Sequence, residues 1–395
     1  MERAWDVVII GAGPAGSTAA ATLAPLGHSV LLLDRHSFPR EKVCGDGLIP
    51  DALTSLRSLG LYDRVKRLGH SVDHLTVVSP AGIHVEIPAE CITLRREKLD
   101  TLILEHAISR GSTFVKARIE RVQQEERGGV RALVAPTGEL IHARVAIIAT
   151  GANVELLVPL GMVVQQRANG MATRCYVRSP VEIDRLIVSF EKEAAPGYGW
   201  IFPMGGGEYN VGCGIFYDDE RCAKVNLRQT FESFTAAKVA RSLMTGADSI
   251  TPLRGARLRA GLGGAVLFNG GSVIAIGETI GSTYPFTGEG IGKAMETAML
   301  AAQQVHLALE QGDTEPLSLL PALVEEQLSP RYLGYRVAQR WISKPWLTDL
   351  LAARICRSPH LTRAAAGIIN ETTDPRTVFT WRTLLPDWMR IGRWG

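Results

Sequence analysis

The chain has 395 residues, of which 46% are hydrophobic and 21% charged, an ordinary balance for a globular protein of two or three domains. The net charge of +3 gives no case for a nucleic-acid partner. No apolar run reaches the roughly 18 residues that a membrane span needs, and a strand expected near residue 6 leaves no room for a signal peptide. The six cysteines lack C-x-x-C spacing, so we expect reduced thiols, no metal and a cytoplasmic protein.

The first elements in the chain form a βαβ unit. Asp6–Ile10 is short, apolar and β-branched, which predicts a strand buried on both faces. Ser17–Leu26 predicts an alanine-rich helix that ends at Gly27. Val30–Leu33 predicts a second buried strand, at the spacing expected for such a unit.

The rest of the chain mixes helical and strand patterns. Helices are expected at Pro50–Leu68, Leu94–Ser109 and Gly288–Gln311, and over most of 313–395. Strands are expected at His74–Ser79, Ile83–Ile87, Thr113–Arg121, Arg131–Val134, Val145–Ala149 and Val273–Ile276, with a mainly β region at 160–217.

A glycine-rich turn joins the first strand to the first helix. Gly11 permits the tight turn, Gly13 lets the backbone approach a pyrophosphate, and Gly16 lets helix and strand pack closely. A carboxylate at Asp34, 18 residues after Gly16, can accept hydrogen bonds from a ribose. The G-x-G-x-x-G pattern therefore predicts a dinucleotide site made by Gly11, Gly13, Pro14, Ala15, Gly16, Asp34 and Arg35.

Two later turns favour FAD over NAD as the resident dinucleotide. Gly151 follows the third buried strand, and Gly277-Glu278 follows the fourth and leads to the long helix. The positive end of a helix built from small residues would stabilise the negative charge of a reduced flavin. The residues expected to bind FAD here are Gly151, Gly277, Glu278, Pro285, Gly288, Gly290 and Ile291.

Taken together, the motifs resemble the geranylgeranyl reductase family of FAD-dependent oxidoreductases, within the flavoproteins of p-hydroxybenzoate-hydroxylase-like fold. Flavin-dependent halogenases are related to this group. The resemblance covers the chain from residue 6 to about 300. The matching stretches are Asp6–Arg35, Pro39–Gly47, Arg95–Asp100, Tyr198–Pro203, Asn210–Gly212 and Gly277–Ile291.

The resemblance and the spacing of the buried strands imply an α/β fold: a Rossmann-type FAD-binding domain with an inserted mixed β-sheet substrate domain and a helical C-terminal region. We expect the FAD-binding domain to be discontinuous, because buried strands far apart in the chain each run into a glycine-rich turn. Its expected pieces are 1–70, 95–158 and 266–312. The substrate domain is expected at 71–94 and 159–265, and the helical region at 313–395.

The resemblance also implies roles for particular residues. Arg96 should contact the FAD phosphates or ribityl chain, and the loop from Arg40 to Gly47, with Gly45, should border the flavin. Cys44 should face the substrate and is the candidate general acid. An apolar cavity suited to a prenyl chain or similar lipid-like substrate is expected above the flavin. It should be lined by Tyr198, Trp200 and Phe202, which alternation places on one face of a strand.

The chain departs from the family pattern at two positions. Glu278 stands where the family usually has an Asp that bonds the ribityl chain, so this contact is expected to shift. Asp34 stands where FAD enzymes more often carry Glu, and either carboxylate can reach a ribose. The subfamily is therefore less well indicated than the cofactor.

The expected reaction is hydride transfer from reduced FAD to a C=C bond of a hydrophobic substrate. NAD(P)H or a protein electron donor would act transiently as reductant, because the chain has no second dinucleotide motif. The alternatives left open are a monooxygenase or halogenase, a desaturase or oxidase running the chemistry backward, and a non-enzymatic electron carrier. Two features speak against halogenation: Tyr198–Pro203 retains only the second Trp and the Pro of the halogenase motif, and residues 71–90 contain no Lys.

The segment 381–394 mixes Trp with Arg, a composition suited to resting on a membrane surface. Peripheral membrane contact through this C-terminal tail is therefore one expectation, and packing of the tail on the body of the protein is the other.

Overall fold

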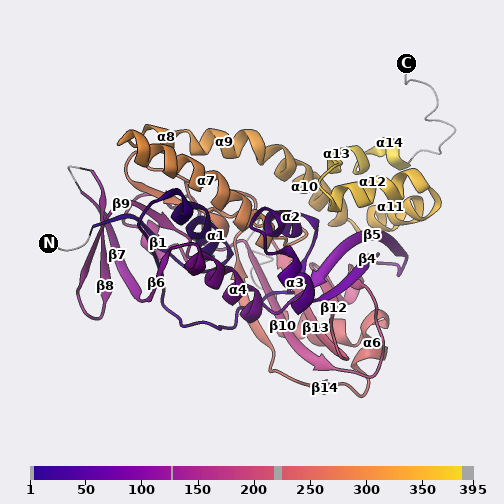
Figure 1. The fold of residues 1–395 in the computed structure, drawn as a ribbon. Helices are drawn as coiled ribbons and strands as arrows, with labels where there is room; N and C mark the ends of the chain where they lie inside the picture. Colours follow the sequence, from indigo (N-terminus) through magenta and orange to yellow (C-terminus); the bar gives the residue numbers. More distant parts are fainter. Residues whose placement is uncertain (1–3, 126–127, 218–224, 385–395) are drawn as a thin grey trace.

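The computed structural model describes residues 4–125, 128–217 and 225–384, and two β-sheets organise them (Figure 1). The first sheet has the order β6-β2-β1-β9-β8-β7, with β16 also pairing with β9. β1, β2, β6, β9 and β16 run parallel, and β7 and β8 add an antiparallel hairpin. The strands are β1 (Trp5–Ile10), β2 (Val30–Asp34), β6 (Thr113–Lys116), β7 (Arg118–Gln124), β8 (Val130–Ala135), β9 (Leu140–Ile148) and β16 (Val273–Ala275).

The parallel strands are apolar because both faces of this sheet are covered. Along β1, Val7 and Ile9 join one hydrophobic core while Val8 and Ile10 join another. The first core packs under α1 (Pro14–Leu23) and α7 (Ile291–Gln311), and α4 (Arg96–Ser109) packs beside α1. The carboxyl ends of β1, β2, β9 and β16 therefore meet at one edge, where ligands bind in such sheets.

The bounds of several predicted helices differ from the observed ones, and two helices differ most. The first begins at Pro14 rather than Ser17 and continues after Leu23 as the 3-10 turn η1 (Ala24–Leu26), with Gly27 at φ +92° as the predicted stop. The single helix expected over Pro50–Leu68 is wrong. The structure has α2 (Pro50–Ser58) and α3 (Tyr62–Leu68), separated at Gly60, whose φ of +70° no helix can contain.

The second sheet has nine strands in the order β14-β10-β13-β12-β11-β4-β5-β3, with β15 also pairing with β10. Its strands are β3 (Gly47–Leu48), β4 (His70–Val78), β5 (His84–Thr93), β10 (Gly170–Arg178), β11 (Leu186–Ser189), β12 (Tyr198–Gly205), β13 (Glu208–Phe216), β14 (Asp248–Ser249) and β15 (Arg254–Leu258). Two short helices, α5 (Leu227–Thr235) and α6 (Lys238–Met244), pack below it.

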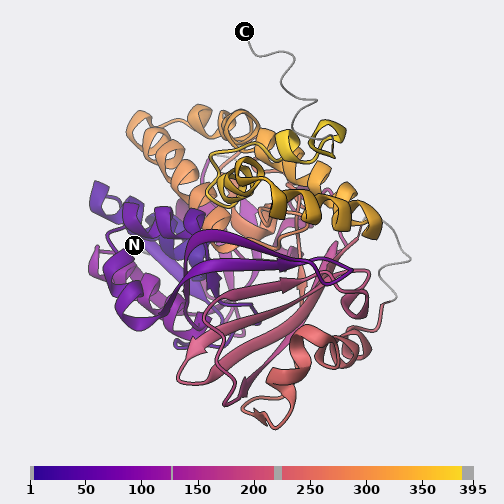
Figure 2. The ribbon, with the colours of Figure 1, turned by 90° about the vertical axis from the view of Figure 1, so that its right-hand side faces the viewer.

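A helical C-terminal region lies over the hairpin end of the second sheet (Figure 2). Its helices are α8 (Glu315–Ser318), α9 (Leu320–Gln327), α10 (Ser329–Ile342), α11 (Pro345–Arg357), α12 (Pro359–Ile369), α13 (Pro375–Val378) and α14 (Trp381–Leu384). Leu351, Ile355 and Leu361 share a core with Val85 and Ile87 of β5, so α11 and α12 form a roof on this sheet.

The mixed α/β architecture confirms the predicted fold class. The division into domains stays a prediction. β4 and β5 pair within the same sheet as the strands of 159–265, and β3 joins this second sheet from within 1–70. The five cysteines in the described ranges are free thiols. No described helix has the length and apolarity to cross a bilayer, and the expected cytoplasmic location stays a prediction.

Candidate cofactor and substrate site

A cavity of about 660 Å³ extends from the carboxyl ends of β1, β2 and β9 to the C-terminal helices. Most of the predicted site residues line it. They are Gly11, Gly13, Pro14, Ala15, Asp34, Arg35, Arg40, Cys44, Gly45, Arg96, Gly151, Tyr198, Trp200, Phe202, Glu278, Gly288, Gly290 and Ile291. Gly16, Gly277 and Pro285 do not line it. A Cβ on Gly16 would lie 1.8 Å from the Gly11 carbonyl oxygen, and one on Gly277 would lie 2.8 Å from the Ala15 Cβ, so these two glycines permit close packing behind the wall.

The glycine turn after β1 leaves no room for a side chain at its first position. Gly11 has φ +109°, and a Cβ there would lie 2.2 Å from the Ala149 carbonyl oxygen at the end of β9. Pro14 occupies the first turn of α1, where its missing N–H costs nothing. The free N–H groups of this helix end therefore face the cavity as an anion-binding edge.

Asp34 closes the same turn from β2. Its two carboxylate oxygens accept hydrogen bonds from the backbone N–H groups of Ala12 and His36, each at 2.9 Å. The carboxylate is fixed at the cavity wall, with lone pairs left for a ligand hydroxyl.

Two arginines bring positive charge to the cavity beside this turn. Arg96 binds the fully buried Asp100 through Nε and Nη2, at 2.7 and 2.9 Å, and Arg40 Nη2 lies 3.2 Å from the same carboxylate. Two cations thus share one anion. The buried Arg40 Nε has no hydrogen-bond acceptor among the described residues. An unsatisfied buried donor and surplus positive charge beside a glycine turn fit the diphosphate of FAD.

Glu278, the departure from the family pattern, follows β16 in the 3-10 turn η5 (Gly277–Ile280). One of its oxygens accepts the Arg259 backbone N–H at 3.3 Å, and the other lies 4.0 Å from Lys42 Nζ. A Cβ on Gly151 would lie 3.5 Å from this second oxygen. The longer side chain therefore spans the space between three segments of the wall.

Cys44 lies in the loop before β3. The buried carboxylate of Asp46 holds this loop in place through hydrogen bonds. Asp46 accepts hydrogen bonds from the Tyr176 hydroxyl and from Asn210 Nδ2 (2.9 Å), and Asn210 Nδ2 also reaches the Cys44 carbonyl oxygen at 2.8 Å. Burial raises the pKa of Asp46 to about 6, against the lowering effect of these donors. Burial likewise raises the pKa of the Cys44 thiol, although the Arg96 guanidinium opposes this shift. Sequence reasoning missed the roles of Asp46, Tyr176 and Asn210.

The three predicted aromatics form one wall of the cavity. Tyr198, Trp200 and Phe202 alternate along β12, with successive ring centroids 6.1 and 6.4 Å apart. Trp200 is anchored by a 2.9 Å hydrogen bond from Nε1 to Asn210 Oδ1. Ideal Cβ atoms on Gly45 and Gly47 would lie 3.1 and 3.2 Å from the Phe202 ring. The glycines of the Cys44 loop therefore allow this loop to approach the aromatic wall.

The cavity continues past the aromatics into an apolar lobe that sequence reasoning did not locate. On one side lie residues of the second sheet, and on the other the C-terminal helices. The lining side chains from these helices include Ala338, Ile342, Leu351, Ala352, Ile355, Ala365, Ile369, Val378 and Phe379. The apolar pattern of residues 313–395 is the sequence feature that could have indicated this lobe. The pattern alone, however, does not distinguish the wall of a cavity from a packed core.

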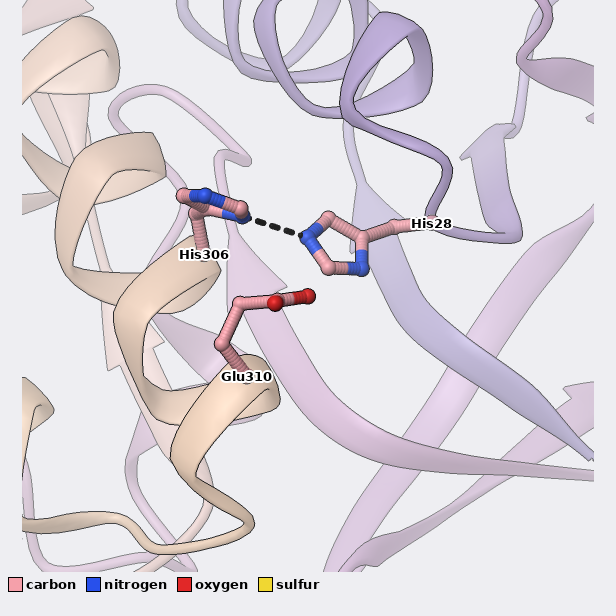
Figure 3. Close-up of side chains that lie close together, drawn as sticks. All are labelled: His28, His306 and Glu310. Carbon is pink, nitrogen blue, oxygen red and sulfur yellow. Dashed lines mark hydrogen bonds between the residues drawn. The ribbon is translucent and has the colours of Figure 1, made fainter.

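A group of potential metal ligands lies away from the cavity. His28, before β2, and His306 and Glu310, four residues apart on α7, bring their ligand atoms within 4.8 Å of one another (Figure 3). They lie near the amino end of β2, opposite the edge that faces the cavity. His28 Nε2 and His306 Nδ1 are hydrogen-bonded to each other at 2.8 Å. We interpret the group as a hydrogen-bonded histidine pair beside an exposed carboxylate.

Known proteins are similar to this chain in sequence and in fold. Residues 4–318 match a family model described as an FAD binding domain. The menaquinone reductase of Mycolicibacterium smegmatis is 33% identical, over 97% of this chain and 96% of that protein. The digeranylgeranylglycerophospholipid reductase of Methanoculleus marisnigri is 27% identical, over 94% of this chain and 95% of that protein. The crystal structure of a geranylgeranyl bacteriochlorophyll reductase-like protein from Thermoplasma acidophilum superposes with a TM-score of 0.80 at 20% identity, over 98% of this chain and all of that one. A flavin-dependent brominase superposes with a TM-score of 0.78 at 19% identity, again over 98% of this chain and all of that one. The chain therefore belongs to the FAD-binding-domain family of oxidoreductases.

Proposed function

We propose that the protein is a reductase that saturates a C=C bond in the prenyl chain of a quinone or a lipid. The observation that carries this proposal is the continuity of the cavity, which joins the dinucleotide-binding edge to the apolar lobe under the C-terminal helices. The relatives named menaquinone reductase and digeranylgeranylglycerophospholipid reductase support the same substrate class.

The residues that would hold FAD follow from the shape and charge of the wall. Asp34 would accept a ribose hydroxyl, and Arg40 and Arg96 would neutralise the diphosphate at the N-terminus of α1. Gly288, Gly290 and the N-terminus of α7 would face the flavin, with Glu278 and Gly151 along the ribityl chain. In its reduced form, FAD supplies a hydride.

The protein's part in the reaction is to orient the substrate and exclude water. Tyr198, Trp200 and Phe202 would pack against the prenyl segment, and the apolar lobe would take the rest of the chain. Cys44 would lie beside the reacting bond. Since burial raises its pKa, its thiol would be protonated at neutral pH, and it stays a candidate proton donor.

The proposed reductant is NAD(P)H or a protein donor that binds transiently. The test is to mix the oxidised holoprotein, without oxygen, with NADH, NADPH or a reduced ferredoxin and follow loss of flavin absorbance. Reduction by a nicotinamide at a rate that saturates with its concentration supports NAD(P)H. Reduction by the ferredoxin alone supports a protein donor.

Contact with a membrane would explain how a lipid enters the apolar lobe. Trp346 and Trp381 are 57% and 61% exposed, and Trp341 lies within 5.2 Å of Trp381 between ring centroids. Residues 329–384 contain nine Lys or Arg against three Asp or Glu. We therefore propose that this face rests on anionic lipid. The tail from residue 385 onward lies outside the described residues.

The membrane proposal is tested by flotation with vesicles that contain or lack anionic lipid. Trp346→Ser with Trp381→Ser should weaken binding to anionic vesicles, and truncation after residue 380 should do the same. Unchanged binding in both variants would remove the proposal.

The reaction type is tested by the product. The reduced holoprotein is mixed with a prenylated quinone, once without oxygen and once with oxygen and halide. The proposal expects a product that gains two hydrogens in both cases. A product that gains oxygen or halogen, and forms only in the presence of oxygen, would replace it with the monooxygenase or halogenase alternative.

A further inference from the structure

A cluster of charged side chains lies behind the cavity wall, where α7 begins. Lys293 is 1% exposed and lies 3.8 Å from Asp51 Oδ2, 2.5 Å from Glu296 Oε2 and 2.7 Å from Glu371 Oε1. Arg331 Nη1 lies 3.0 Å from both Glu296 and Glu371, and its side chain is 39% exposed. The cluster therefore runs from the cavity side of α2 to the molecular surface.

Glu289 joins this cluster to the cavity. It lines the cavity directly before α7, after Gly288, whose φ of +74° lets the chain turn there. Glu289 Oε2 is buried and makes no hydrogen bond of good geometry with the described residues, although the Thr287 hydroxyl lies close enough to favour the charged form. Asp51 lines the same cavity, and its buried Oδ2 also lacks a hydrogen bond there. An ionised carboxylate left in this state would carry a large desolvation cost.

The charges of the cluster do not balance if every carboxyl is ionised. Four carboxyls, those of Asp51, Glu289, Glu296 and Glu371, face two cations, Lys293 and Arg331. Burial, together with the neighbouring carboxylates, raises the pKa of Glu289 well above its ordinary value and that of Asp51 to about 7, although Lys293 opposes both shifts. Glu371 has its pKa lowered, since Lys293, Tyr284 and Arg331 all contact it and outweigh its burial. The protons are therefore held on the two carboxyls that face the cavity.

We propose that Glu289 is the proton donor of the reduction and that Asp51 and Lys293 return the proton to it. The inference rests on the proposed function. The π bond of the substrate breaks, one carbon gains a hydride from the reduced flavin, and the other gains the Glu289 proton. The substrate takes up the two electrons that the flavin loses, and Glu289 is left as a carboxylate. Lys293 stabilises that carboxylate until a proton arrives through Asp51 from the surface side of the cluster.

A carboxylic acid suits this step better than the Cys44 thiol. An isolated C=C bond is a weak proton acceptor, and a carboxyl group is an intrinsically stronger acid than a thiol. Burial raises the pKa of the Cys44 thiol further, against the smaller opposing effect of the Arg96 guanidinium, which makes the thiol a still weaker acid. Cys44 therefore has the role of contacting the substrate.

The groups that surround Glu289 come from several elements. Asp51 on α2, Lys293 on α7 and Glu371 after α12 act on it. The ring hydroxyls of Tyr198 on β12 and Tyr335 on α10, and the thiol of Cys91 on β5, also lie within its electrostatic reach. The three neutral groups stay protonated when Glu289 ionises. The reduction rate should therefore fall as pH rises through the titration of the Glu289 and Asp51 carboxyls.

The test is single-turnover oxidation of the prereduced holoprotein by a prenylated quinone without oxygen. Glu289→Gln keeps the size of the side chain and removes the acid, so flavin reoxidation should slow by ~100-fold or more, as for loss of a general acid. The rate should no longer depend on pH, while Glu289→Asp should restore part of it. The exposed Glu105→Gln serves as the control variant. A Glu289→Gln rate within about threefold of wild type would overturn the inference.

A second readout does not depend on turnover. A protonated buried carboxyl gives an infrared carbonyl band that shifts in D₂O. Wild-type protein at pH 7 should show one such band that Glu289→Gln lacks, whereas the band of Asp51 should remain in both spectra. Identical spectra would overturn the inference. If wild-type protein fails to reduce the quinone while the band is present, the proposed function fails and the protonated Glu289 stands.

Discussion

Gly11 and Gly27 both have left-handed backbone but differ in their surroundings. A Cβ on Gly11 would overlap the Ala149 carbonyl, whereas a Cβ on Gly27 would meet nothing within 4 Å. We therefore expect Gly27→Ala to cost ~1 kcal/mol of unfolding free energy, the strain of the backbone alone. Gly11→Ala should cost more and abolish FAD binding. Denaturant unfolding measures the loss of stability in each variant, and the absorbance of bound flavin measures FAD binding. Retention of FAD by Gly11→Ala would contradict the placement of the dinucleotide at this turn.

Asp46 should make stability depend on pH. Its pKa of about 6 in the folded protein lies above the ordinary value of an unfolded Asp, so the folded state retains the proton. The stabilisation is complete below the unfolded pKa and is lost as pH rises through 6. Relative to Asp46→Asn, wild-type protein should therefore lose roughly 2–3 kcal/mol between pH 4 and 7. Chemical denaturation of the two apoproteins at both pH values measures this difference. Parallel curves would show that the pKa of Asp46 is the same in the folded and unfolded states, contrary to this account.

At the residue scale, local motifs were predictable and long-range contacts were not. Gly11, Gly13 and Asp34 lie within one βαβ unit whose geometry a short pattern fixes. Asp46, Tyr176 and Asn210 lie far apart in the chain and meet through the pairing of β10 with β13 and the approach of the Cys44 loop. Glu289 lay inside a recognised motif, but its importance depends on burial and on Asp51 from another helix, which no spacing reveals.

At the scale of elements, the C-terminal helices were predicted and their role was missed. Helical periodicity shows that α11 and α12 have an apolar face, but the same pattern fits a packed core and a cavity wall. The structure shows both roles in the same side chains, since Leu351, Ala352 and Ile355 belong to the core shared with β5 and also line the apolar lobe. The break between α2 and α3 was missed because a single Gly60 is also tolerated inside a helix.

Filling the apolar lobe should discriminate substrates by length. Ala352 on α11 is buried and lines the cavity, so Ala352→Phe should raise KM for long prenyl chains by about tenfold or more and leave short ones nearly unaffected. Leu350→Phe on the exposed side of the same helix is the matched control. Steady-state kinetics over a series of chain lengths, with flavin content measured in parallel, give the comparison. Equal effects on short and long chains would place the substrate elsewhere.

At the scale of the whole molecule, the two sheets and the C-terminal helices each contribute a different part of the cavity wall. The first sheet presents a dinucleotide-binding edge, the second supplies the aromatic wall, and the C-terminal helices enclose the apolar lobe between them. Three regions distant in the chain thereby build one continuous cavity. This arrangement accounts for a substrate that is long and apolar and is reduced away from water.

The central claim is that the reduced holoprotein transfers hydrogen to a C=C bond of a prenyl chain held in this cavity. The most direct measurement is a single turnover of the prereduced protein with a prenylated quinone under strict exclusion of oxygen, with the product analysed by mass spectrometry. We predict flavin reoxidation and, in equal amount, a quinone whose side chain has gained two hydrogens. Reoxidation that leaves the side chain unchanged, or no reoxidation until oxygen is admitted, would contradict the claim.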